Sequence, residues 1–250
     1  MLKALIFDCD GVLVDTERDG HRVGFNRAFK QMGIDAEWSV ELYEKLLEVA
    51  GGKERMTHYF NSFGWPEGTS SDEEKVALIA ALHKEKTAIV SKLVNEGDDM
   101  PLRPGISRIV DEAIAAGVRL GVCTTSNAKF IDAVLDKFGA ERKAKFEFVH
   151  AGDVVSRKKP DPEIYNLAKT SLDVGGSGPA VHECAVIEDS RVGFLAASGA
   201  GLPVLVTTST YTTQEDFTGA VKVVPELGDA PNVNVTLAEL GELAAATATK

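Results

Sequence analysis

"ALIFDCDG", residues 4–11, decides the fold, because an apolar run ends there in two aspartates one residue apart and a glycine. The apolar residues 4–7 predict a short buried strand, and Asp8 and Asp10 then lie in the loop just past its C-terminal end. Two acids at the end of one buried strand indicate a site that needs negative charge.

From about residue 102 onward, the chain alternates between helical and strand patterns. Strands separated by helices of about 10–15 residues are typical of βαβ units. We therefore expect an α/β fold with a doubly wound, Rossmann-like parallel sheet. The predicted helices are 106–117, 128–139, 162–172 and 192–201, and the predicted strands are 118–126, 146–153, 184–190 and 203–208.

Residues 16–100 show helical periodicity without a convincing strand. We expect this segment to be an all-helical insertion into a core formed by residues 1–15 and 101–250. Its first predicted apolar face comprises Phe25, Ala28, Phe29 and Met32.

The composition is that of an ordinary globular protein, with a net charge of −11 over 250 residues. No basic surplus is available to neutralise phosphates, so we expect neither nucleic acid nor an anionic membrane as a partner. No apolar run approaches the roughly 18 residues of a membrane span. The first strand begins by residue 4, so either the protein works where it is made or a targeting segment is missing from this chain.

The three cysteines, Cys9, Cys123 and Cys184, have no CxxC spacing, and each lies in or beside a predicted buried strand. We therefore expect neither a disulfide framework nor a zinc site, and a reducing compartment fits this pattern. Two flanking acids would raise the pKa of Cys9, which makes it a small buried spacer rather than a nucleophile.

Ligands of open α/β sheets bind outside the carboxyl ends of the strands, so the polar residues that follow each apolar run are the candidates for a site. Acids that converge there would repel one another without a cation, and an all-oxygen ligand set favours Mg²⁺. A lysine and a hydroxyl beside them suit a phosphoryl group, because the ammonium offsets its charge and the hydroxyl donates a hydrogen bond. The candidates are Asp8, Asp10, Thr124, Lys159, Glu188 and Asp189.

The first strand end supplies the reacting groups of this hypothesis. Asp8 is the candidate nucleophile, because a carboxylate can attack phosphorus and form an aspartyl phosphate. Asp10 is the candidate general acid/base, which protonates the leaving alcohol and later takes a proton from water. Gly11 lets the backbone turn tightly and approach the ligand.

Four motifs carry a family resemblance. "DCDGVLVD", "VCTTS", "KKPDPEIY" and "VIEDSRVG" resemble, in order and spacing, the motifs of the haloacid dehalogenase superfamily of phosphotransferases. The helical insertion 16–100 resembles the type 1 cap domain of that superfamily, and the resemblance covers essentially the whole chain.

The resemblance implies a role for each motif residue. The first aspartate, Asp8, is the nucleophile and the second, Asp10, is the acid/base, while Thr124 and Lys159 bind the phosphoryl group. The implied Mg²⁺ ligands are Asp8, Glu188, Asp189 and Asp10, the last through its backbone carbonyl.

Further stretches resemble the CbbY group of this superfamily, especially its plant and algal members: "DGHR", "GGKERMTHYF", "HAGDVVSRKKPDPEIYNLA" and "YTTQEDF". This resemblance implies a phosphatase that converts xylulose 1,5-bisphosphate, a Rubisco inhibitor, to xylulose 5-phosphate. The resemblance also implies that the protein is located in the chloroplast stroma, with the cytoplasm as the alternative location. We expect the protein to be a monomer. The resemblance weakens around residues 64–75 and after residue 225, where no family motif lies.

A glycine pair followed by two cations stands out in the insertion: Gly51, Gly52, Lys53 and Arg55. Positive charge beside a permissive turn suits the non-reacting phosphate of a bisphosphate, and an arginine can bind it bidentately. The alternative is that the two cations only begin a solvated helix.

Other candidate substrate contacts lie beside the first two motifs. Glu17 and His21 can contact sugar hydroxyls or assist proton transfer, although His21 is equally well explained as a partly buried histidine with a protein partner. Thr125 is a further candidate for substrate binding, and Ser126 and Asn127, which follow the turn at Thr124, either bind the phosphate or cap the next helix.

Several other functions share part of this chemistry. A β-phosphoglucomutase returns the phosphoryl group to a turned-around intermediate instead of water, and a general sugar-phosphate phosphatase is a further alternative. The sequence disfavours a dehalogenase, because hydrolysis of a carbon-halogen bond needs neither Asp10 nor a metal-binding acid pair. The sequence also disfavours a receiver-type signalling module. The acceptor aspartate of such a module ends the middle strand, and here the corresponding stretch "LGVCTTS", residues 120–126, contains no acid.

Overall fold

The computed structural model describes residues 1–49, 52–96, 100–152, 154–173 and 176–249. The chain divides into two compact units: unit 1 is Met1–Asp15 with Pro101–Lys250, and unit 2 is Thr16–Met100. Within the described ranges, no helix has the length and apolar character needed to cross a membrane.

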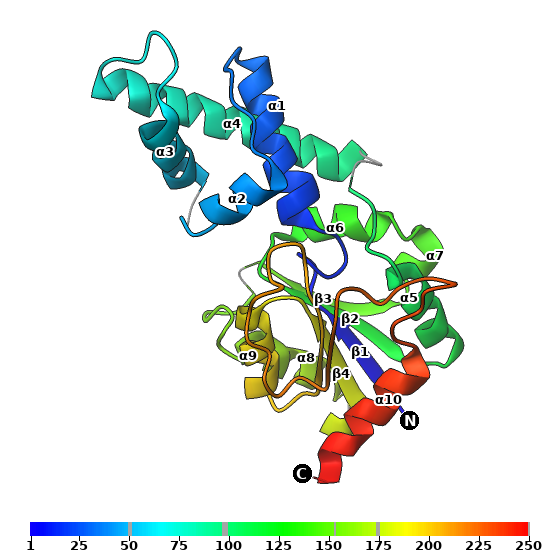
Figure 1. Cartoon of the computed structure of the whole chain (residues 1–250). Helices are drawn as coiled ribbons and strands as arrows, with labels where there is room; N and C mark the ends of the chain where they lie inside the picture. Colours follow the sequence, from blue (N-terminus) through cyan, green and yellow to red (C-terminus); the bar gives the residue numbers. More distant parts are fainter. Residues whose placement is uncertain (50–51, 97–99, 153, 174–175, 250) are drawn as a thin grey trace. The chain divides into compact units, whose positions relative to one another are not determined.

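Unit 1 is built on a six-stranded sheet of parallel strands in the order β3-β2-β1-β4-β5-β6 (Figure 1). The order reverses at β1, whose carboxyl end is therefore the switch point where such sheets bind ligands. The predicted doubly wound α/β fold is confirmed. The strands are β1 Ala4–Phe7, β2 Arg119–Thr124, β3 Phe146–Ala151, β4 Cys184–Glu188, β5 Val204–Thr207 and β6 Lys222–Val224. The helices are α5 Ile106–Ala115, α6 Ala128–Asp136, α7 Ala140–Lys143, α8 Glu163–Leu172, α9 Arg191–Gly199 and α10 Leu237–Ala245.

The strand register brings the polar residues of three strand ends to one edge. Phe7, the last residue of β1, pairs with Ile187 of β4. Asp8 follows directly, and its backbone N–H donates to the Ile187 carbonyl over 3.0 Å. Thr124 and Glu188 end β2 and β4 at this same edge. Residues far apart in the sequence are therefore placed side by side by the sheet itself.

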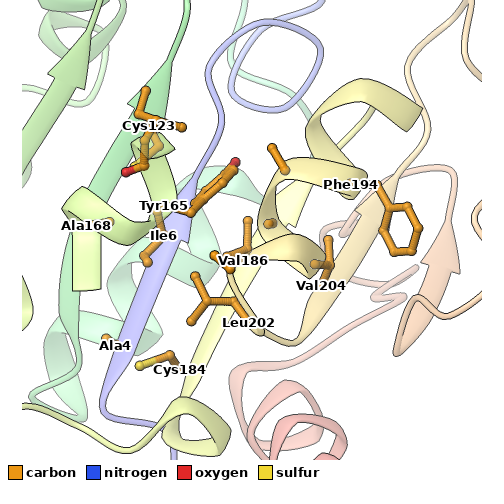
Figure 2. Packing of buried hydrophobic residues seen from close by; sticks show 14 of the residues in the cluster. Ala4, Ile6, Cys123, Tyr165, Ala168, Cys184, Val186, Phe194, Leu202 and Val204 are labelled. Atoms are coloured by element: carbon orange, nitrogen blue, oxygen red, sulfur yellow. The ribbon is translucent and has the colours of Figure 1, made fainter. Parts of the chain in front are cut away.

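Apolar side chains cover both faces of the central strands. Ala4 and Ile6 of β1 belong to a buried cluster with residues of α8 and α9 (Figure 2). Leu5 and Phe7 alternate with them, point to the opposite face and are fully buried as well. A strand that is buried on both faces has to be apolar at every position, which explains the uninterrupted run "ALIF".

The other face of the sheet is covered by α5 and α10, which contact β2 and β4 and each other (Figure 1). α10 begins at Thr236, whose side chain caps the helix, and it buries Leu237, Leu240 and Ala244. Neither α10 nor β6 is among the predicted elements. β6 has three residues, too few to show a period, and α10 lies in an Ala- and Thr-rich end of the chain that has little apolar contrast.

Unit 2 is helical in its described part, and its core is an aromatic cluster. The Phe25 ring lies 4.6 Å from that of Trp38 and 6.1 Å from that of Tyr43, and Phe29 lies 5.1 Å from Trp38. The predicted apolar face is wrong at Met32, which is 38% exposed because α1 ends one residue earlier. The elements are a π-helical turn Thr16–Arg22, α1 Val23–Gln31, α2 Val40–Leu46, α3 Gly52–Phe63 and α4 Asp72–Glu96.

Candidate active site

Asp8 lies directly after β1 in a buried, hydrogen-bonded position. Its Oδ1 accepts from Lys159 Nζ over 2.8 Å. The same ammonium donates to Glu188 Oε1 over 2.7 Å and to the Cys123 carbonyl over 3.0 Å. Because an ammonium has three donors, Lys159 engages all of them on groups from β1, β2 and β4.

The charges of this cluster perturb one another strongly. Burial raises the pKa of Asp8 well above its usual range; Lys159 opposes this effect, and the neighbouring carboxylates of Glu188, Asp10 and Asp189 add to it. Burial alone would lower the pKa of Lys159, but the Asp8 and Glu188 carboxylates raise it above its ordinary value. Lys159 is therefore a fixed cation that favours the ionised form of Asp8.

Asp8, Glu188 and Asp189 are grouped closely enough to hold a metal ion. Each offers a carboxylate oxygen, and the three oxygens all lie within 4.8 Å of one another. Burial, and next the charge of Glu188, raises the pKa of Asp189 to about 7. A divalent cation among the three carboxylates would remove this repulsion, and oxygen ligands are those that Mg²⁺ prefers. The residues present therefore fit a magnesium ion.

Tyr165 on α8 completes the surroundings of Glu188. Its hydroxyl donates to Oε1 of Glu188, the oxygen that also accepts from Lys159. The tyrosine is fully buried in the cluster between α8 and the sheet, with Lys159 Nζ 5.1 Å from its ring centre (Figure 2). Sequence reasoning missed this role, because a tyrosine at an apolar position of a helix indicates only the core.

Two glycines make room for the acids of β4. A Cβ atom on Gly11 would lie 2.0 Å from Asp189 Oδ2, and the φ of 76° at Gly11 belongs to the left-handed region that favours glycine. A Cβ atom on Gly193, in the first turn of α9, would lie 2.0 Å from Glu188 Oε2. The sequence predicted the tight turn at Gly11. The close approach of the Glu188 carboxylate to the Gly193 backbone has no sequence signal beyond the glycine itself.

The carboxylate of Asp10 points to hydroxyl groups rather than to the other acids. Ser126 Oγ donates to Asp10 Oδ2 over 2.6 Å, and Thr124 Oγ1 donates to the same oxygen over 3.2 Å. The backbone N–H of Ser126 donates to Thr124 Oγ1 over 3.0 Å. Asp10, Thr124 and Ser126 thus form one hydrogen-bonded group, and the hydroxyl expected to meet a phosphoryl oxygen is directed at Asp10.

The two remaining candidates at the second motif, Thr125 and Asn127, have different surroundings. Asn127 Oδ1 accepts from the backbone N–H of Phe130 over 3.0 Å and caps α6, which is one of the two uses expected for it. The Thr125 side chain is exposed. Their contact with a phosphate stays a prediction.

The cations predicted in the insertion have contrasting environments. Gly51 lies outside the described residues, Gly52 begins α3, and Lys53 is exposed in its first turn. Arg55 is buried instead: its Nε donates to the Leu46 carbonyl over 3.1 Å. A solvated helix start thus describes Lys53 and not Arg55.

Tyr43 links Arg55 to Glu17 within unit 2. Arg55 Nη1 donates to the Tyr43 hydroxyl over 2.9 Å, and this hydroxyl donates to Glu17 Oε2 over 2.7 Å. The guanidinium also lies 5.2 Å from the centre of the Tyr43 ring. Tyr43 was not among the predicted residues, because its helical spacing indicates only an apolar core.

A second cationic group that sequence reasoning missed is Lys86 on α4. Its Nζ lies 3.0 Å from His21 Nδ1 and 4.8 Å from the centre of the Phe25 ring. Burial lowers the pKa of Lys86 to about 8, an effect that Arg55 strengthens and Glu17 opposes. His21 therefore has a protein partner, as the alternative interpretation of this histidine predicted, and that partner is Lys86. Lys86 stands in a charged helical run where nothing in the sequence distinguishes it from its solvated neighbours.

A family model for haloacid dehalogenase-like hydrolases matches residues 2–201. The buried aspartate after β1, the lysine that contacts it and the acid pair after β4 accord with that match. The chain belongs to the haloacid dehalogenase-like hydrolase family.

Individual relatives indicate which group of haloacid dehalogenase-like hydrolases this chain resembles. A CbbY-like protein of Arabidopsis thaliana is 49% identical over 242 residues, which cover 96% of this chain and 74% of the relative. The crystal structure of CbbY from Rhodobacter sphaeroides with phosphate is 36% identical, with a TM-score of 0.68 over 96% of this chain and 99% of that one. A β-phosphoglucomutase of Bacillus subtilis is 30% identical over 80% of this chain and 81% of the relative. The chain is thus a phosphatase of the CbbY-like group.

Proposed function

We propose that this chain is a Mg²⁺-dependent sugar-bisphosphate phosphatase that converts xylulose 1,5-bisphosphate to xylulose 5-phosphate and so removes a Rubisco inhibitor. The observation that carries the proposal is the buried Asp8 carboxylate 2.8 Å from Lys159 Nζ, with a second acid, Asp10, two residues further on. A mutant of CbbY from Rhodobacter sphaeroides, 36% identical to this chain, has been solved in complex with xylulose-(1,5)bisphosphate.

The proposed reaction has two steps at one aspartate. Asp8 attacks the phosphorus and forms an aspartyl phosphate, while Asp10 gives its proton to the departing sugar oxygen. Asp10 then takes a proton from a water molecule, whose oxygen attacks the phosphorus and releases inorganic phosphate and the Asp8 carboxylate. Ser126 and Thr124 hold Asp10 in place for both proton transfers.

Mg²⁺ would be held by Asp8, Glu188, Asp189 and the backbone carbonyl of Asp10. When bound, it neutralises charge on the phosphoryl oxygens and on the carboxylates around them. Lys159 adds a fixed positive charge beside Asp8, which favours the ionised form of the nucleophile and attracts the phosphoryl group.

Unit 2 supplies the proposed specificity as a cap domain. We assign Lys53 and Arg55, with the turn at Gly51 and Gly52, to the non-reacting phosphate, and Glu17 with His21 to the sugar hydroxyls. Closure of such a cap would exclude water during phosphoryl transfer. Phosphate contacts from Thr125, Ser126 and Asn127 are part of the same proposal.

We further propose a monomer in the chloroplast stroma. The support for this location is the similarity to a plant relative.

A mutase is the second candidate function, and the similarity to a β-phosphoglucomutase of Bacillus subtilis favours keeping it. Both enzymes would share Asp8 and Asp10 and differ in what accepts the phosphoryl group. Release of inorganic phosphate therefore separates them.

The test is Mg²⁺-dependent phosphate release from xylulose 1,5-bisphosphate and ribulose 1,5-bisphosphate, measured side by side with β-glucose 1-phosphate and with the Asp8→Asn variant. We expect release mainly from the xylulose compound, lost without Mg²⁺ and in the variant. Equal release from both bisphosphates would refute the specificity and leave the chemistry. Conversion of β-glucose 1-phosphate without net phosphate release would favour the mutase.

A further inference from the structure

Arg103 stands where the chain re-enters unit 1, and its side chain gathers carbonyl groups from three separate segments. Nη1 donates to the Thr207 carbonyl over 3.1 Å and to the Gly11 carbonyl. Nη2 donates to the carbonyls of Thr208 and Pro225, each over 2.7 Å. A guanidinium can do this because its donors lie in one rigid plane and stay charged, so that each bond is charge-assisted.

The Gly11 carbonyl is the partner that links Arg103 to the candidate metal site. Gly11 follows Asp10, whose backbone carbonyl is a proposed metal ligand, and Gly11 itself lies against the Asp189 carboxylate, since a Cβ there would be 2.0 Å from Oδ2. This close approach requires a glycine, and a glycine restrains its own backbone least of all residues. The conformation of this turn therefore depends on hydrogen bonds from other segments of the chain.

The other hydrogen bonds of this turn are mostly internal. The Gly11 N–H donates to the Val14 carbonyl over 2.8 Å, and the Leu13 N–H donates to the Cys9 carbonyl over 2.9 Å. Arg103 adds two bonds from another part of the chain: its side chain holds the Gly11 carbonyl, and its backbone N–H donates to the Leu13 carbonyl over 2.8 Å. The guanidinium thus joins the turn after β1 to the segments that follow β5 and β6.

We propose that Arg103 is a positioning residue for the metal site: it fixes the Asp10–Gly11 turn against the Asp189 carboxylate in the conformation that binds Mg²⁺. This inference rests on the metal site of the proposed function. It requires no contact between Arg103 and the substrate.

Arg108 on α5 provides a matched control within the same unit. It too holds backbone carbonyls, those of Gly228 over 3.0 Å, Leu227 over 3.1 Å and Val235 over 2.7 Å. These partners belong to the segment before α10 and not to the turn after β1. Replacing Arg108 therefore removes the same kind of clamp without touching the metal site.

The test compares the full-length wild type with Arg103→Lys, Arg103→Gln and Arg108→Lys by calorimetric titration with Mg²⁺ alone, so that no substrate is needed. Loss of an outer group that orients a metal ligand typically weakens metal binding by about 10–100-fold. We expect about tenfold weaker Mg²⁺ binding in Arg103→Lys, more in Arg103→Gln, and a change of less than about twofold in Arg108→Lys. Half-maximal phosphatase activity should shift to higher Mg²⁺ concentration by the same factor, with activity recovered when Mg²⁺ is saturating.

Equal Mg²⁺ affinity in Arg103→Lys and the wild type would overturn the proposal, as would an equal loss in Arg108→Lys. Failure of both Arg103 variants to fold, judged by circular dichroism, would make Arg103 a structural residue and overturn its positioning role. Weak binding by Arg103→Lys together with an inactive wild type would support the positioning role and refute the proposed function alone.

Discussion

Lys159 Nζ lies 2.8 Å from Asp8 Oδ1, and this contact joins the third sequence motif to the first across 151 positions of the chain. The lysine side chain is 6% exposed and that of Asp8 is 10% exposed, so water screens the pair little. An ammonium in this place opposes the rise in the Asp8 pKa that burial causes and so favours the ionised carboxylate. The proposed nucleophilic role of Asp8 therefore depends on this pair.

Lys159→Met should lower kcat/KM for the bisphosphate by at least about 100-fold, because Asp8 loses the charge that stabilises its ionised form. The variant should also be less stable at neutral pH, since Asp8 and Glu188 are left buried without their cation. The exposed neighbour Lys158 provides the control: Lys158→Met should leave both properties nearly unchanged. Steady-state kinetics and thermal melts of both variants check this, and similar activities in the two would contradict it.

Gly193→Ala should disrupt the site through steric contact alone, because the new methyl group would lie 2.0 Å from Glu188 Oε2. We expect a loss of about 1–3 kcal/mol in the free energy of unfolding, as for overpacked positions, and a clear loss of Mg²⁺ binding. Gly199→Ala, in the same helix, is the matched control. Its Cβ would meet Pro162 Cβ at 3.5 Å, an ordinary contact, so it should fold and bind Mg²⁺ like the wild type. Denaturant titration and calorimetry separate the two.

How much of the site the sequence predicts depends on what each signal measures. Asp8 and Glu188 lie at the ends of apolar runs, and a parallel sheet gathers such ends at one edge, so the pattern predicted that these acids meet. Lys159 comes from the loop between β3 and α8, and the structure places its Nζ against both acids. The sequence did not predict the contacts of Tyr165 and Gly193 with Glu188, because both residues lie within amphipathic helices, where a tyrosine or a glycine indicates only packing. Their contacts with Glu188 depend on how α8 and α9 lie on the sheet, which no local pattern records.

The same distinction applies to the fold. β1 follows from its uninterrupted apolar run, and the helical nature of unit 2 follows from local periodicity, as do Phe25 and Phe29 in its core. β6 and α10 do not, because their places are fixed by the sheet edge and by Arg108, whose guanidinium donates to Val235 just before α10. Met32 has the helical spacing of Phe25 and Phe29 but is exposed, because α1 ends before it and periodicity does not report where a helix ends.

Lys86→Met should stabilise the protein at pH 7, because the wild type buries a charged ammonium there. The pKa of Lys86 is about 8 in the folded protein against an ordinary value of 10.5, so the unfolded chain binds more protons between these values. Wild-type stability should therefore rise as the pH increases from 8 to 10.5, and the advantage of the variant should vanish over that range. We expect an advantage of about 2 kcal/mol at pH 7. Chemical denaturation at several pH values measures it.

Lys84→Met, at an exposed position of the same helix, is the control for this experiment. It should show little stabilisation at pH 7, because this side chain is already in contact with solvent. A Lys86→Met variant that is no more stable at pH 7 than the wild type would show that the ammonium is well compensated by His21 and Glu17.

Ser126→Ala should lower kcat about tenfold, because Ser126 Oγ, 2.6 Å from Asp10 Oδ2, orients the proposed general acid/base. Thr170→Ala on α8 is the control for loss of a hydroxyl outside the candidate site, because the Thr170 side chain is exposed and donates to the Asn166 carbonyl over 3.1 Å. The split between kcat and KM distinguishes orientation from substrate binding: a misoriented acid/base slows the proton transfers, whereas a lost phosphate contact weakens binding of the substrate. If Ser126→Ala instead raises KM and leaves kcat unchanged, Ser126 acts only as a phosphate ligand, one of the two roles that the sequence left open, and Thr124 alone orients Asp10.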